Sequence, residues 1–72
     1  MEFTLTELRK IKRNLTRQNM ENLAIEFGYS FSYVRQHFSG HGKNEELLVR
    51  ASEIAYENAQ RAKAAKEKIK KL

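Results

Sequence analysis

The apolar residues of the chain recur at spacings of three and four positions, which is typical of helices that bury one face. No segment alternates polar and β-branched residues as a half-buried strand would. Four segments begin with a residue that can cap a helix: Thr4, Thr16, Ser30 and Asn44. The sequence therefore predicts an all-α fold, a small domain of four helices.

The first two predicted helices are joined by a short link. The first runs from about residue 5 to residue 14, because Thr4 and Glu7 fit a capping box. The second follows Thr16 and ends at Gly28, with Asn19 as a competing cap. We expect their apolar faces to be buried, through Leu5, Leu8 and Ile11 in the first helix and Met20, Leu23, Ala24 and Phe27 in the second.

The last two predicted helices differ in length. The third is short and covers about residues 31–38, after which Gly40 and Gly42 interrupt the chain. The fourth begins after Asn44, where two glutamates lie near the positive end of the helix dipole. It can run to the end of the chain, a length of roughly 40 Å.

The second and third predicted helices carry the pattern of two helices that cross at a sharp bend. Such a pair needs a small residue at the contact, a glycine at the bend and a branched apolar anchor. Ala24, Gly28 and Val34 fill these positions. The stretch from residue 23 to residue 40 resembles the helix-turn-helix of the phage repressor/Cro family, and the resemblance covers about residues 5–56.

The resemblance implies a DNA-binding domain in residues 1–56. Its second helix would lie across the DNA backbone and its third helix in the major groove. One position departs from the family pattern, because the site of His37 is usually apolar there. Either Phe38 takes over the packing or the helix is slightly rotated, and we expect His37 at the surface or only partly packed.

The third helix offers a polar face for reading bases. With Val34 at the centre of the buried face, Ser32 and Gln36 lie nearly opposite, and Arg35 flanks them. Arginine can bind guanine, glutamine can bind adenine and serine can bind either. We expect these three residues to read bases, and Phe31 to touch a thymine methyl group. The alternatives are an ordinary solvated helix face and, for Phe31, a position at the edge of the core.

The start of the second helix is the expected site of phosphate contacts. Free N–H groups and the helix dipole attract an anion there, which favours Thr16, Arg17 and Gln18. Tyr33 and Lys43 are the other candidates, although Arg17 and Lys43 could serve solubility alone. A basic cluster near the amino end faces either DNA or water: Arg9, Lys10, Lys12 and Arg13.

Residues 57–72 form a basic extension of the fourth helix. A heptad seam runs along this helix, and its first part, with Leu47 and Ile54, should belong to the core. Beyond the core, pairing with a second copy is the leading interpretation. A frayed, solvated tail and a basic tail that follows DNA phosphates are the alternatives. The predicted dimer seam consists of Ala55, Asn58, Ala62, Ala65, Ile69 and Leu72.

Charge is distributed unevenly along the 72 residues. The chain has 14 lysines and arginines against 9 glutamates, a formal net charge of +5. Residues 60–72 carry the whole excess, so residues 1–59 are balanced. A general affinity for nucleic acid therefore cannot be read from the composition alone.

Several classes of function are not expected from the composition. The chain has no cysteine, no aspartate and no glycine-rich phosphate loop, so we expect neither an enzyme nor a cofactor. His37 and His41 have a spacing that can bind zinc on a helix, but the glycines break the helix there and we expect no metal site. No apolar run approaches the ~20 residues that span a bilayer. We expect a soluble cytoplasmic protein without a membrane partner or an evident small-molecule substrate.

These observations favour a regulator that binds double-stranded DNA sequence-specifically. A homodimer would match a nearly palindromic operator whose half-sites lie about one turn, ~34 Å, apart. The resemblance suggests a repressor of the phage or mobile-element type. The alternative is a non-catalytic protein-interaction module that uses the Phe31, Tyr33 and Arg35 surface or the seam of the fourth helix.

Overall fold

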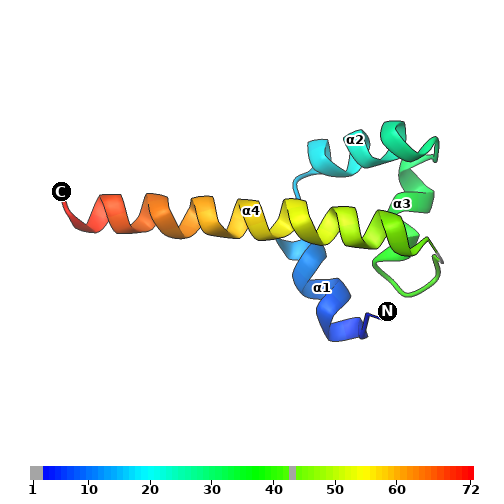
Figure 1. Ribbon diagram of the computed structural model, residues 1–72, viewed down its shortest axis with the longest axis horizontal. Coiled ribbons are helices and arrows are strands. Elements are labelled where there is room, and N and C mark those ends of the chain that lie inside the picture. The colour runs from blue at the N-terminus through cyan, green and yellow to red at the C-terminus, as the bar shows by residue number, and fades with distance from the viewer. Residues whose placement is uncertain (1–2, 43) are drawn as a thin grey trace.

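The computed structural model describes residues 3–42 and 44–72, which form four helices and no strand within those ranges (Figure 1). The helices are α1 (Leu5–Arg13), α2 (Arg17–Phe27), α3 (Phe31–His37) and α4 (Glu45–Lys70). In Figure 1, α1 and α2 lie on either side of the first half of α4, and α3 lies near the end where α4 begins. The predicted all-α fold of four helices is confirmed.

Each helix begins at the residue that the sequence predicts as its cap. The side-chain oxygen of the cap accepts a hydrogen bond from a backbone N–H in the first turn of the helix, which leaves one fewer unpaired donor. Asn19 is not a competing cap, because its Oδ1 accepts from the Thr16 N–H at 2.9 Å and completes a capping box. The caps are Thr4, Thr16, Ser30 and Asn44.

The bend between α2 and α3 depends on Gly28. This residue has φ of +71° and ψ of +31°, a left-handed conformation that glycine adopts without a steric cost. The N–H groups of Gly28 and Tyr29 then donate to carbonyls in the last turn of α2, including that of Ala24. The chain can therefore turn within two residues before Ser30 caps α3.

The hydrophobic core lies between the first half of α4 and the other three helices. Leu23, Val34 and Leu47 are almost completely buried, and they come from α2, α3 and α4. The prediction for Leu5 is wrong, because 54% of its surface is exposed. Leu5 lies in the first turn of α1, where its side chain approaches the turn at Gly40 and otherwise faces solvent. The remaining core residues are Leu8, Ile11, Leu15, Ala24, Phe38, Leu48, Ala51 and Ala55.

His37 is fully buried, contrary to the expectation of a surface or partly packed residue. The Asn44 N–H donates to its Nε2 at 3.3 Å, so its Nδ1 carries the hydrogen and donates to the Tyr33 carbonyl oxygen at 2.8 Å. Gly42 lies against the imidazole, and a Cβ there would overlap the ring. Phe38 is buried as well. The hydrogen bond from Asn44 to His37 connects the last turn of α3 to the start of α4. His37 and Phe38 are both buried, so Phe38 does not replace His37 in the core.

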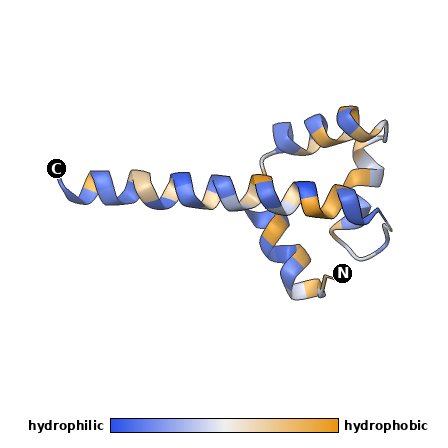
Figure 2. Cartoon of the chain, viewed as in Figure 1, coloured by the Kyte–Doolittle hydropathy of each residue, from blue (hydrophilic) through white to orange (hydrophobic). Residues whose placement is uncertain are grey.

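The second half of α4 extends beyond the packed part of the domain. Ala55 is the last buried residue of the helix, and every residue from Gln60 onward is exposed. Figure 2 shows the consequence, since apolar colour is concentrated where the helices meet and polar colour dominates the extension. Within the described ranges, no helix has both the length and the apolar character that crossing a bilayer would require.

Candidate nucleic-acid interface

The outer face of α3 brings together the three polar side chains predicted to read bases. Val34 is completely buried, while Ser32, Arg35 and Gln36 on the other side of the helix are exposed. A shallow hollow is lined by these three residues and by Lys12, Ser39 and His41. Of the described residues that line it, none is acidic, so the surface offers hydrogen-bond donors and positive charge to an anionic partner.

Lys12 and His41 also lie on this face, and neither was predicted to do so from the sequence. Lys12 belongs to α1, and only the tertiary packing of α1 brings its side chain beside α3. Its membership of the basic cluster near the amino end was a signal, but that pattern left open whether the cluster faces DNA or water. His41 lies just after the turn that follows α3, where its backbone N–H donates to the Gln36 carbonyl oxygen at 3.0 Å.

Phe31 links α2 to α3. Its half-buried ring lies 5.3 Å from the Arg17 guanidinium carbon and 6.0 Å from that of Arg35. Both distances are within the range of a cation–π contact. Phe31 is therefore partly buried and contacts one predicted phosphate residue and one predicted base-reading residue.

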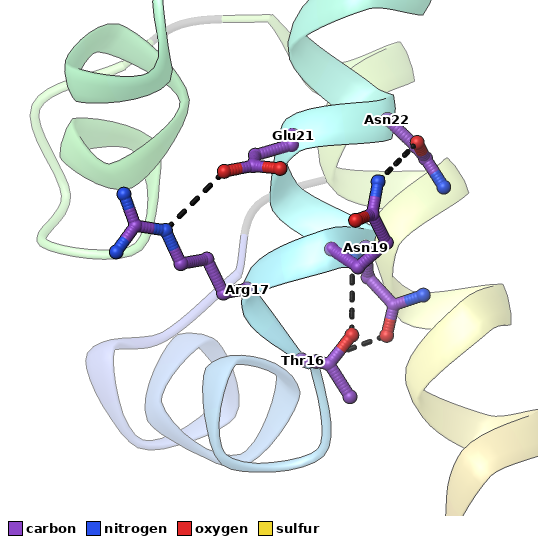
Figure 3. Close-up of polar contacts among 6 residues, drawn as sticks. Thr16, Arg17, Asn19, Glu21 and Asn22 are labelled. Atoms are coloured by element: carbon purple, nitrogen blue, oxygen red, sulfur yellow. Dashed lines mark hydrogen bonds and ion pairs between the residues drawn. The ribbon is translucent and has the colours of Figure 1, made fainter.

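The first turn of α2 is organised by a capping box (Figure 3). Thr16 Oγ1 accepts from the Asn19 N–H at 3.0 Å, and the Thr16 N–H donates to Asn19 Oδ1 at 2.9 Å, so both groups of Thr16 take part in the cap. The N–H groups of Arg17 and Gln18 are those that an α-helix leaves without an internal partner. Arg17 also forms an ion pair with Glu21, in which Nε and Oε1 are 3.2 Å apart, and both side chains are well exposed.

Tyr33 and Lys43 are the other two residues predicted to contact phosphate. Tyr33 lies on the flank of α3 between the polar face and the buried face, where its ring packs edge-on against Tyr29 with centroids 4.7 Å apart. It lines a hollow together with Glu45 and Glu46, and carboxylates there would repel a phosphate. Tyr33 is therefore poorly placed for a phosphate contact. Lys43 lies outside the described residues.

Acidic side chains gather on the surface away from α3's polar face. Glu26, Arg50 and Glu53 form a half-exposed ion-pair group in which Arg50 approaches both carboxylates at 3.6 Å. Glu45 and Glu46 line hollows near the start of α4. The hollow on α3 is thus lined by basic and neutral residues and the hollows at the start of α4 mainly by glutamates, although residues 1–59 are balanced in total.

The predicted dimer seam divides into two parts. Ala55 is 95% buried against its own domain, with 5% of its surface exposed. Asn58 Nδ2 donates to the Asn14 carbonyl oxygen at 2.8 Å and to Asn19 Oδ1 at 2.9 Å, so it fastens α4 to the link between α1 and α2. These two residues stabilise the monomer and are not free for a partner. The other four seam residues are exposed: Ala62, Ala65, Ile69 and Leu72.

No protein-family model matches the chain, and comparison with curated proteins and with solved structures likewise gives no match. Among the described residues, no group of three or more histidine or acidic side chains is arranged to hold a metal ion.

Proposed function

We propose that this chain binds double-stranded DNA sequence-specifically as a dimeric transcriptional regulator. The observation that carries the proposal is the outer face of α3, where Ser32, Arg35 and Gln36 are exposed together and Lys12 lies beside them. An α-helix fits the major groove, and these side chains have the donors and acceptors that distinguish base pairs there.

The start of α2 supplies the contact with the DNA backbone in this proposal. Phosphate would bind the first N–H groups of α2 and the exposed guanidinium of Arg17. Arg17 also contacts Phe31, the first residue of α3. A phosphate held at α2 would consequently fix the position of α3 in the groove.

The proposed regulatory role is repression by occupying an operator. The four described helices would act together as one small unit that binds there. Two copies would read two half-sites about one turn apart. The resemblance to the phage repressor/Cro family supports this proposal through Ala24, Gly28 and Val34, which form the bend that the pattern predicts.

The first experiment is selection from a randomised duplex pool at two salt concentrations. The expected result is a two-fold symmetric motif and an affinity that falls steeply as salt rises, because phosphate contacts release counterions. If the chain retains no DNA even at low salt, the result would favour the interaction-module alternative, because an aromatic protein interface does not depend on phosphate contacts.

Two arginine variants then separate base reading from backbone contact. We expect Arg35→Ala to cost about 1–3 kcal/mol on the selected site and to relax its base preference, and Arg17→Ala to weaken all sequences alike. Arg50→Ala is the matched control, since it removes an arginine from the acidic side of the domain. Equal losses from Arg35→Ala and Arg17→Ala on random DNA would exclude a base-reading role for Arg35.

A further inference from the structure

The two halves of α4 carry opposite charges. Residues 45–57 hold four glutamates against Arg50, a net charge of −3, whereas residues 60–72 hold six basic residues against Glu67, a net charge of +5. The first half is covered by the domain on one side only, and the second half is exposed all round. Any pairing that brings two tails together places one +5 segment against another, and like charges at close range repel.

The outer face of the first half of α4 has the features of a docking surface. Val49 and Tyr56 lie on it, with 37% and 66% of their surfaces exposed. Val49 lines a shallow hollow with Glu45, Glu46, Glu53 and Arg50. Arg50 pairs with Glu53 there, with Nη1 and Oε2 3.6 Å apart. The two glutamates at the start of α4 also line the neighbouring hollow beside Tyr29 and Tyr33. The surface is therefore apolar at two points and negatively charged in sum around them, which suits a helix that carries lysines.

We propose that two copies of this chain pair through the outer faces of their α4 helices in antiparallel orientation. Each basic tail then lies along the acidic first half of the partner's α4. With the pair centred near Asn58, Glu53 is level with Lys63 of the second copy, and Glu46 is level with Lys70. The end of the tail reaches the hollow beside Tyr29 and Tyr33, where aromatic rings and carboxylates both favour a cation.

This pairing deepens the proposed function, on which this one step rests, because it gives one dimer two α3 helices related by a two-fold axis. A nearly palindromic operator requires that symmetry.

Single cysteines test the orientation, because the chain has none of its own. Val49 and Glu67 lie on the outer face and are level with each other in the proposed pair. Oxidation of a mixture of Val49→Cys and Glu67→Cys chains, without DNA, should give the mixed disulfide. Each variant alone should give little dimer, because like positions are roughly 27 Å apart. Homodimers from either variant alone would indicate parallel pairing and overturn the proposal.

Charge reversal tests the complementarity. Lys63→Glu should weaken self-association about tenfold in sedimentation equilibrium at low salt. The effect is doubled because each two-fold symmetric dimer contains the Glu53–Lys63 pairing twice. Adding Glu53→Lys to the same chain should restore self-association. Absence of rescue, or a wild-type chain that stays monomeric at low salt, would overturn the pairing.

A third arm separates this inference from the DNA-binding proposal. Sedimentation and cross-linking contain no DNA, so their result stands whether or not α3 reads bases. If the wild-type chain is monomeric and removal of residues 62–72 weakens binding to random duplex DNA, the tail acts on phosphates and the pairing is excluded.

Discussion

Residues 3–58 and residues 59–72 are stabilised in different ways, although α4 runs through both. In the first region every helix has a cap and a buried face, and α4 packs against α1 and α2. In the second region α4 continues for about three turns, and its residues from Gln60 onward are exposed. One helix can therefore be stabilised by tertiary packing at one end and by its own backbone hydrogen bonds at the other. Isolated helices of that length are marginal in water, so the tail depends on the packed half to begin it.

The largest effect expected from this comparison is that of Leu47→Ala. Leu47 is completely buried, and its removal leaves a cavity that should lower the free energy of unfolding by about 2–5 kcal/mol. A small domain has only about 5–15 kcal/mol in total, so the variant is expected to be partly unfolded at moderate temperature. Urea unfolding followed by circular dichroism measures it. Ile69→Ala in the tail is the control and should change the value by less than about 0.5 kcal/mol; similar losses in the two variants would refute the division.

Asn58 marks the boundary between the regions, and its substitution should have an intermediate effect. Asn58→Ala removes two hydrogen bonds that fasten α4 to Asn14 and Asn19. We expect a loss of about 1–2 kcal/mol in the free energy of unfolding, since net hydrogen-bond contributions are of that order. Gln60→Ala, two positions further along the exposed part of α4, should be nearly neutral in the same urea titration. A neutral Asn58→Ala would move the boundary toward Ala55.

A shortened chain that ends at Arg61 should have a still smaller effect on stability. It lacks only exposed residues, so the free energy of unfolding should change by less than about 0.5 kcal/mol. The helical signal in circular dichroism should fall, because the last turns of α4 are missing. The measurement belongs at a concentration where the chain is monomeric. A loss of several kcal/mol would show that the tail stabilises its own domain.

The smallest effect concerns pH and the start of α1. The Thr4 backbone N–H donates to Glu7 Oε1 at 2.9 Å, which holds the pKa of that carboxyl below its usual value. The charged carboxylate therefore stabilises the folded state above the usual carboxyl pKa, and this contribution disappears as the pH falls through the lowered value. Glu7→Gln should flatten that part of the pH dependence in urea titrations. An unchanged slope would show that the capping box does not respond to pH.

The sequence predicts the local parts of this fold well. Thr4, Thr16, Ser30 and Asn44 all cap as expected, because a cap needs only residues within the same turn. Gly28 also behaves as predicted, since its left-handed conformation is a local property. The exposed face of α3 follows from helical periodicity alone, once Val34 is taken as buried.

Positions that depend on distant residues were not predicted. His37 is buried because Gly42 and Asn44 close over its ring, and helical periodicity within α3 contains no information about that loop. Asn58 looks like a polar interruption of a seam, yet its partners are about forty residues earlier in the chain. Lys12 reaches the face of α3 only because α1 folds beside it. In each case the missing information is which segments meet in space.

The uninterrupted course of α4 also determines how the molecule tumbles. Its extents are 44 × 24 × 16 Å, and α4 lies along the longest of them (Figure 1). The N–H vectors of α4 are therefore nearly parallel to the long axis, and only the slower end-over-end rotation reorients them. In nitrogen-15 relaxation the amides of α4 should consequently show larger transverse rates than those of α1, which crosses that axis. The transverse relaxation rates of the amides in each other helix therefore report the orientation of that helix relative to α4, and no interproton distance is needed.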